Sequence, residues 1–203
     1  MSLCSCMLRR PWTFASQCRT WHFLLLRKRD VVEEMPSPVG HLLAGVVVGS
    51  LVSPRAGWPA LAACAVAAAI PDIDLLLPVA HRGPTHSVAA AMIAFGAAVL
   101  MLRGKKWRVD GVRLASAIAL AVLSHALLDW LGEDSSRPRG VMAFWPVSRG
   151  YYISNLDLFA AVDRRYWIDG FWRRNTAAFA RELAILVPLA WLAARRARTR
   201  KRT

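Results

Sequence analysis

Acidic residues are scarce in this sequence, with 13 Asp and Glu against 27 Lys and Arg, which gives a formal net charge of +14. Such an excess is typical of nucleic-acid binders, and also of membrane proteins whose cytoplasmic ends carry Lys and Arg. Charge is almost absent from the stretches around Val46, Ala65, Val99, Leu120 and Leu186. Because nucleic-acid binders rarely contain apolar runs long enough to span a bilayer, we expect membrane lipids as surroundings and no nucleic-acid partner.

Cysteine is also scarce, and its positions exclude a disulfide scaffold. Cys4, Cys6 and Cys18 precede the apolar stretches, whereas Cys64 lies inside one and is expected to pack as a small hydrophobe. Together with His22, the first three have no spacing typical of a zinc site.

Residues 1–34 lack an organised pattern. Their single apolar piece, 23–26, is too short for a signal peptide, and no small-residue cleavage site follows it. We predict that residues 1–34 are disordered or not natively translated, with Met35 as the natural start. Residues 35–196 are then the membrane-embedded helical domain, and residues 197–203 are a basic tail.

The apolar pattern predicts an all-α, polytopic membrane bundle of four to five helices. The expected ranges are 39–52, 57–77, a third helix capped by Thr85 and running to 102, 112–131 and 176–194. The first is short, since a span needs about 20 residues. The connecting segment 132–175 is rich in Trp and Tyr, which is typical of a membrane interface, although packed aromatics of a soluble loop remain an alternative. Among them are Trp145, Tyr151, Tyr152, Trp167 and Trp172.

Most of the ionisable residues near the helices lie at helix ends. If every helix crosses the membrane, the start of the first, the end of the second, the start of the third and the end of the fourth share one membrane face. The residues at these ends are His41, Asp72, Asp74, His86, His125 and Asp129. The sequence therefore predicts that these six side chains gather at one face as metal ligands.

Spacing supports this convergence. His125 and Asp129 are four residues apart, so they share one side of an apolar helix. Asp72 and Asp74 can converge only if Pro71 ends the regular helix before them. Neighbouring carboxylates require a cation, and a set of imidazoles and carboxylates is typical of zinc, with manganese or iron as alternatives. Ionisable groups at membrane depth are functional candidates by default.

Each of these residues also has a structural explanation. His41 and His86 could be helix-start residues with local hydrogen bonds, and the two aspartates after Pro71 could simply end a helix. The pair of His125 and Asp129 could be a satisfied hydrogen bond between packed helices. The convergence of all of them on one face favours a functional site.

Four strings carry a resemblance to a known family: Gly40-His41, Pro71-Asp72-Ile73-Asp74, the segment 81–87 (HRGPTHS) and the segment 124–129 (SHALLD). They resemble the membrane-bound metal-dependent hydrolases, also described as LexA-binding, inner-membrane-associated hydrolases. The likeness covers about residues 35–159. It implies a bacterial inner-membrane location and a metal-dependent hydrolase, and it does not name a substrate.

A more distant likeness connects the chain with zinc-dependent phospholipase C and the single-strand nucleases. Those enzymes have an Asp and a His fourteen positions apart, like Asp72 and His86, and a His-x-x-x-Asp pair, like His125 and Asp129. His41 would correspond to an early histidine that binds a second metal. The chain lacks the later ligands of their three-metal site, so one or two metals are expected.

We therefore expect hydrolysis of a phosphoester. The expected substrate is a lipid, a lipid-linked molecule or another small-molecule phosphoester. Arg82 is the candidate phosphate clamp, and His81 or Glu133 the candidate proton carrier. The backbone N–H groups of residues 85–87 are a further candidate for binding an anion.

Two other classes stay open: a transporter using the polar cluster as an ion path, and a scaffold or DNA-tethering protein using the basic tail. Arg55, the linker 103–113 and the tail share the face opposite the site, which favours that face as cytoplasmic.

Overall fold

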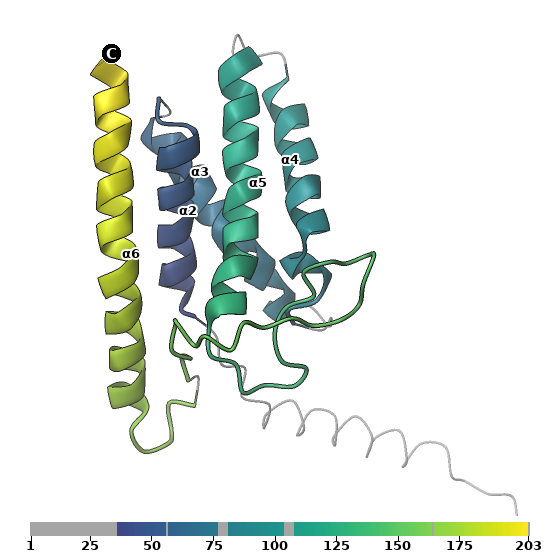
Figure 1. Ribbon diagram of the computed structural model, residues 1–203, viewed down its shortest axis with the longest axis vertical. Helices are drawn as coiled ribbons and strands as arrows, with labels where there is room; N and C mark the ends of the chain where they lie inside the picture. Colours follow the sequence, from purple (N-terminus) through teal and green to yellow (C-terminus); the bar gives the residue numbers. More distant parts are fainter. Residues whose placement is uncertain (1–35, 56, 77–80, 104–107, 164, 203) are drawn as a thin grey trace, which may run out of the picture. The chain divides into compact units, whose positions relative to one another are not determined.

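The described part of the chain contains five α-helices and two 3-10 helices in a computed structural model (Figure 1). The structure describes residues 36–55, 57–76, 81–103, 108–163 and 165–202, all within one unit of residues 33–203. The elements are α2 (Pro38–Val52), α3 (Trp58–Ala69), η1 (Ile70–Leu76), η2 (Pro84–His86), α4 (Val88–Leu102), α5 (Arg108–Leu131) and α6 (Phe171–Arg202). These ranges hold two isolated β-bridges and no strand, which confirms the all-α prediction. The predictions for residues 1–34 and for Met35 lie outside the described residues.

The start of α2 is fixed by its sequence. Ser37 is the N-cap, its hydroxyl accepts the Gly40 N–H at 3.2 Å, and Pro38 occupies the first turn, where a missing N–H costs nothing. This places His41 one turn inside the helix, with its side chain fully buried.

Pro71 ends the α-helix α3 before the two aspartates, as their convergence requires, although the predicted helix continued to residue 77. The α-helix stops at Ala69, and the 3-10 helix η1 carries Pro71, Asp72 and Asp74. The tighter winding of a 3-10 helix turns the chain so that both carboxylates can face the same region.

Several predicted helix boundaries differ from those of the structure. The N-cap of α4 is Ser87, whose hydroxyl accepts the Ala90 N–H, while Thr85 lies in η2 and bonds Asp74. The last helix begins at Phe171 and continues to Arg202, so the basic tail prolongs α6 and does not leave it at Ala194. Arginine and lysine are good helix formers, and nothing in the tail interrupts the helix.

Small side chains hold the bundle together. Helix α5 packs against α2, α3 and α4, whereas α6 packs against α2 alone among the described helices. The core around α3, α4 and α5 consists chiefly of alanine, including Ala68, Ala117 and Ala121. A Cβ at Gly45 would collide with the Cys64 carbonyl, so α2 and α3 approach at backbone distance, as is common in lipid.

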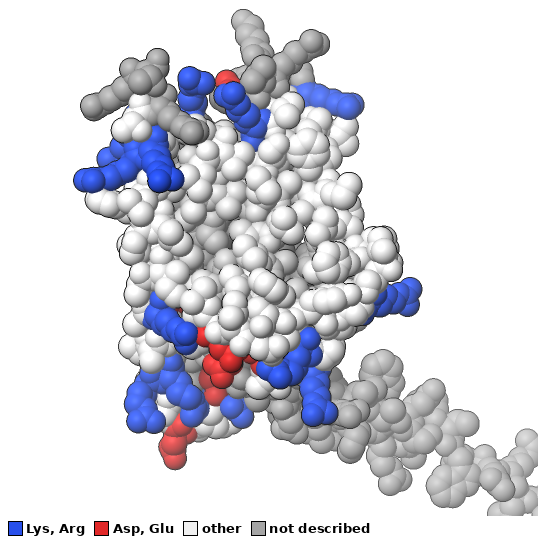
Figure 2. Space-filling model, in the orientation of Figure 1, with Lys and Arg blue, Asp and Glu red and all other residues white. Residues whose placement is uncertain are grey.

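Length and composition allow three segments to cross a membrane: Trp58–Leu76, Asp110–Leu131 and Phe171–Thr199. Helices α2 and α4 are shorter apolar helices. On the face drawn in Figure 2, a broad uncharged belt separates a nearly all-basic end from an end where acidic and basic side chains mix. A charge-free belt between charged ends is the pattern of a bundle that spans a bilayer.

A long irregular segment, 132–170, packs against the end of the bundle where α5 finishes. Its backbone is fastened by hydrogen bonds from Met142 N–H to the Arg82 carbonyl and from Val88 N–H to the Ala143 carbonyl. Trp167 is 66% exposed, as expected for an aromatic at a membrane interface.

Candidate metal centre

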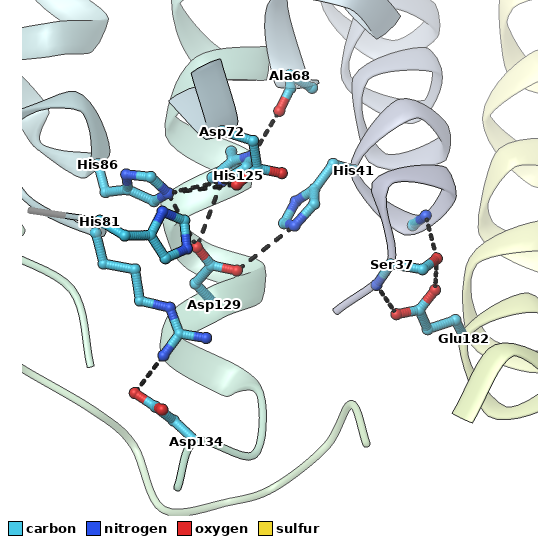
Figure 3. A network of polar contacts seen from close by, with 12 residues as sticks. Ser37, His41, Ala68, Asp72, His81, His86, His125, Asp129, Asp134 and Glu182 are labelled. Carbon is cyan, nitrogen blue, oxygen red and sulfur yellow. Dashed lines mark hydrogen bonds and ion pairs between the residues drawn. The ribbon is translucent and has the colours of Figure 1, made fainter. Parts of the chain in front are cut away.

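Five histidine and aspartate side chains from four elements meet where α5 ends (Figure 3). Helix α2 supplies His41, η1 supplies Asp72, η2 supplies His86, and α5 supplies His125 and Asp129. Within each of three groupings, the candidate ligand atoms lie within 4.8 Å of one another: His41, Asp72 and His125; Asp72, His81 and His86; and His86, His125 and Asp129. The structure thus brings together the residues that the order of the helices predicts.

The protonation of His125 is fixed by its neighbour. Its Nδ1 lies 2.6 Å from the carbonyl oxygen of Ala68, which can only accept, so Nδ1 carries a hydrogen and donates it. The other ring nitrogen, Nε2, then presents its lone pair to the cluster. A carbonyl or carboxylate behind a histidine is the usual device that orients a metal-binding imidazole.

His86 has the same arrangement. The Thr85 hydroxyl donates its single hydrogen to Asp74 at 2.7 Å, so it accepts from Nδ1 of His86 at 2.9 Å. Asp74 also lies 3.4 Å from that nitrogen. The Nε2 atom of His86 therefore presents a lone pair to the cluster, as that of His125 does.

These two lone pairs face each other. The Nε2 atoms of His86 and His125 are 2.9 Å apart, and each is 3.3 Å from the same carboxylate oxygen of Asp129. Two nitrogen lone pairs and a carboxylate repel one another unless a cation lies among them. With bonds of about 2.0–2.1 Å, ligand atoms are about 2.9 Å apart at a right angle and about 3.3 Å apart in a tetrahedron. The donor set and its spacing therefore fit a divalent metal.

Asp72 and His41 also border this position. An oxygen of Asp72 lies 3.3 Å from Nε2 of His125, and Nε2 of His41 lies 3.5 Å from the second oxygen of Asp129. The His41 ring stacks on His125 with centroids 3.7 Å apart. Several buried atoms lack a hydrogen-bond partner in the described structure, which is costly unless a cation is present. They are both ring nitrogens of His41, one oxygen of Asp72 and both oxygens of Asp129.

Without a metal, a proton must serve as this cation. Burial lowers the pKa of His86, but contacts with Asp129, Asp72 and Asp74 outweigh it and raise that pKa to about 10. A metal entering the site has to displace this proton.

Asp74 lies behind His86. One of its oxygens contacts Nδ1 of His81 at 2.6 Å, and the other accepts from Thr85. Among the described residues, Asp74 belongs to none of the three candidate groupings, so its position suits an orienting role. His81 is the neighbour of Asp74 and contacts the edge of the His86 ring.

Arg82 is almost fully buried and forms an ion pair with Asp134. The same Asp134 carboxylate accepts the backbone N–H groups of Ser136 and Gly140. Arg82 has a positive φ of 58°, and its carbonyl accepts Met142 N–H. Arg82 therefore fastens the irregular segment to the site.

The structure gives Glu133 and the backbone of residues 85–87 hydrogen bonds away from the cluster of histidines and aspartates. The Glu133 side chain is exposed and accepts the Ala161 N–H at 3.4 Å. The idea of an anion site on the backbone of residues 85–87 is wrong for His86, since its N–H already donates to the Gly83 carbonyl.

Four groups that contact or support the site were missed by reasoning from the sequence. The Asp-Ser-Ser string at Asp134 is a recognisable turn signal, but its pairing with Arg82 has no local signature. The Ala68 carbonyl is invisible in any sequence. Burial and the charge of Asp74 raise the pKa of the Tyr151 hydroxyl, which links that residue to the site.

The fourth is Glu182 of α6, a buried acid in the middle of an apolar helix. It accepts both the N–H and the hydroxyl of Ser37, the N-cap of α2, one turn before His41 (Figure 3). An acid inside an apolar helix is a signal of a functional or paired side chain that is visible in the sequence.

Residues 35–200 match the family described as YdjM inner membrane protein. No curated protein and no solved structure matches the chain. The family match and the apolar helices together identify a multi-pass protein of the inner membrane.

Proposed function

The chain belongs to the YdjM inner membrane protein family, and we propose that it is a metal-dependent hydrolase acting on a phosphoester in a lipid or lipid-linked substrate. One observation carries the proposal. The Nε2 atoms of His86 and His125 face each other 2.9 Å apart beside Asp129, and both rings are held from behind by oxygen acceptors.

Four residues would hold the metal: Asp72, His86, His125 and Asp129. His41, beside the second oxygen of Asp129, is a candidate for a further ligand. Zinc suits this nitrogen and oxygen set, and manganese and iron accept the same ligands. When bound, the metal would lower the pKa of a water molecule and polarise a phosphoryl oxygen of the substrate.

Other groups of the protein would orient the metal-binding rings and move protons. The Ala68 carbonyl fixes the ring of His125, and Asp74 with Thr85 fixes the ring of His86. His81, bonded through Nδ1 to Asp74, is our candidate for taking the proton from the attacking water. Glu133 bonds the loop backbone at Ala161 and is the weaker candidate for this role.

Access to the cluster supports a lipid substrate. Of its side chains, those of Asp72 and His81 keep exposed surface, 15% and 9%, while those of His41, His86, His125 and Asp129 have none. Beside Asp72 on η1, Ile73 is 51% and Leu76 84% exposed. A phosphoester entering past these apolar side chains would keep its acyl chains in a favourable environment.

Arg82 acts in this proposal by positioning the loop, whereas its sequence motif predicts a direct phosphate clamp. Its ion pair with Asp134 positions the loop over the site. Direct binding of a phosphate by Arg82 would require that ion pair to open.

A transporter is the second candidate, and the depth of the polar groups weighs against it. An ion path needs ionisable groups along the whole thickness of the membrane. The cluster of histidines and aspartates lies instead at one end of the bundle, and the core around α3, α4 and α5 is apolar.

The test is turnover of a phosphoester by the protein in lipid nanodiscs supplied with zinc or manganese. Phosphatidic acid and phosphatidylglycerol would be compared with glycerol phosphate, which has the same reacting group without acyl chains. We expect turnover of a lipid and little of glycerol phosphate.

Asp129→Asn should lower turnover by more than about 100-fold. Substitution of a residue that only hydrogen-bonds to a metal ligand already lowers metal affinity or activity by about 10- to 100-fold. Asp110→Asn, an exposed carboxylate at the opposite end, is the matched control and should keep full activity. Turnover that survives Asp129→Asn would remove this cluster from the reaction.

A further inference from the structure

A second site lies at the basic end of the bundle, between the last turn of α2 and the last turns of α6. It is a cavity of about 170 Å³. Its lining consists of Ser50, Ser53, Pro54, Leu61, Ala194, Ala197 and Arg198. The distance along α2 from His41 to Ser53 is about 18 Å at 1.5 Å per residue, so the cavity is remote from the candidate metal centre.

Three of the residues that line this cavity carry hydrogen-bond donors. Ser50 and Ser53 are 3% and 7% exposed, and Arg198 lies beside them in the lining. Arg198 is exposed and forms no ion pair within the described part of the chain. A guanidinium with adjacent hydroxyls is a favourable arrangement for a phosphate group.

The cavity lies at the depth of lipid headgroups. Arg195 stacks on Trp191 with its guanidinium carbon 3.8 Å from the ring centroid, and Trp191 is 53% exposed. Trp58, at the start of α3, is 79% exposed at the same end. Tryptophan and arginine together mark a membrane interface, and Arg198 is less than one turn beyond Arg195.

The charge of this end selects for an anion. The described side chains here include six arginines and one acid, Asp110, which lies 3.9 Å from Arg113. The arginines are Arg55, Arg103, Arg113, Arg195, Arg196 and Arg198. The carbonyl end of α2 at Ser53 opposes an anion, so binding here has to depend on a specific arginine.

We propose that this cavity binds the phosphate of an anionic phospholipid and that the bound lipid fastens α6 to the bundle. Helix α6 packs against α2 alone among the described helices. The hydrogen bonds of Glu182 with Ser37 join these two helices at the site end, and the lipid joins them at the basic end. This lipid is a structural ligand, and the proposal does not depend on the hydrolase function.

The experiment measures thermal unfolding of the full chain in detergent as lipid is added. Phosphatidylglycerol should raise Tm, while phosphatidylcholine with the same acyl chains and glycerol phosphate should have little effect. In Arg198→Gln the lipid concentration needed for the half-maximal rise should increase about tenfold, the loss expected for one charged hydrogen bond to phosphate.

Arg196→Gln is the matched control. It removes the same charge from the same helix, at a residue that does not line the cavity, and it should respond to phosphatidylglycerol as the unmodified protein does. Ala197→Leu is a second variant that fills the cavity and keeps Arg198. It should abolish the response to phosphatidylglycerol without lowering Tm in detergent alone.

Three results would overturn the proposal. The first is an equal response to phosphatidylglycerol and phosphatidylcholine. The second is an equal loss in Arg196→Gln and Arg198→Gln, which would mean diffuse attraction without a site. The third is an unchanged response in Ala197→Leu. A DNA duplex that stabilises the protein as strongly as phosphatidylglycerol would instead assign these arginines to nucleic acid.

Discussion

The two ends of the bundle use ionisable residues in opposite ways. At the site end, Asp74, His86, His125 and Asp129 are at most 1% exposed, and His86 contacts the other three. At the basic end, Arg113 and Asp110 form a pair whose side chains are about half exposed. Burying charge is costly unless it is paired or bound to a metal, whereas an exposed pair costs and contributes little. The difference indicates that the site end is organised for chemistry and the basic end for contact with the membrane surface.

Breaking the buried pair at the site end should have the largest effect on stability. Arg82→Met leaves the buried carboxylate of Asp134 without its cation, and we expect a loss of about 3–5 kcal/mol in the free energy of unfolding. Thermal unfolding in detergent measures this. The double variant Arg82→Met with Asp134→Leu should recover part of the loss. A single variant as stable as the unmodified protein would contradict the structural role of this pair.

A smaller effect is expected for the residue that orients His86. Asp74→Ala removes the acceptor behind the imidazole but none of the four proposed ligands, and should weaken zinc binding by about 10- to 100-fold. Competition with a chelator of known affinity measures it. Asp163→Ala, which removes a carboxylate paired with Arg165 in the irregular segment, should leave zinc affinity unchanged. Loss of all zinc in Asp74→Ala would make Asp74 a ligand.

Metal affinity should depend on pH with a definite sign. The pKa of His86 without metal is raised to about 10, so His86 is protonated at neutral pH and the metal must displace that proton. Affinity should therefore increase up to tenfold per pH unit between pH 6 and 8, with proton release. Without metal, the stabilisation from protonated His86 is complete below pH 6.5 and is lost as pH rises through 10.

Calorimetric titrations with manganese in two buffers of different ionisation enthalpy measure the metal affinity and the number of protons released on binding. A flat affinity and no proton release between pH 6 and 8 would contradict the predicted displacement.

The smallest effect belongs to the exposed pair at the basic end. Arg113→Met should change the free energy of unfolding by no more than about 1 kcal/mol, because solvent screens a pair that is half exposed. The same unfolding experiment as for Arg82→Met gives a direct comparison of the two ends. An equal loss of unfolding free energy in Arg82→Met and Arg113→Met would contradict the difference between the two ends of the bundle.

The sequence predicted the site end well because helix order and proline position are local information. Counting membrane crossings placed His41, Asp72, His86 and His125 at one end, and Pro71 ended α3 as expected. The structure confirms the all-helical fold. The resemblance to hydrolases was decisive for the type of reaction, which stays a proposal.

Features that depend on long-range contacts could not be predicted. Asp134 reaches Arg82 across 52 positions, and Glu182 reaches Ser37 across 145. The Thr85 hydroxyl donates its hydrogen bond to Asp74, and Ser87, in place of Thr85, is the N-cap of α4. Helix propensity in the tail was underestimated because a basic cluster was treated as the end of a helix.

The most direct test of the central claim is the metal content of the protein purified in mild detergent, by elemental analysis. The proposal predicts close to one or two equivalents of zinc, manganese or iron, and loss of the metal in the double variant His125→Ala with Asp129→Ala. The variant Asp110→Ala should keep the full content. A protein that remains folded and holds no metal, before and after incubation with these ions, would contradict the metal centre and favour a transporter or scaffold.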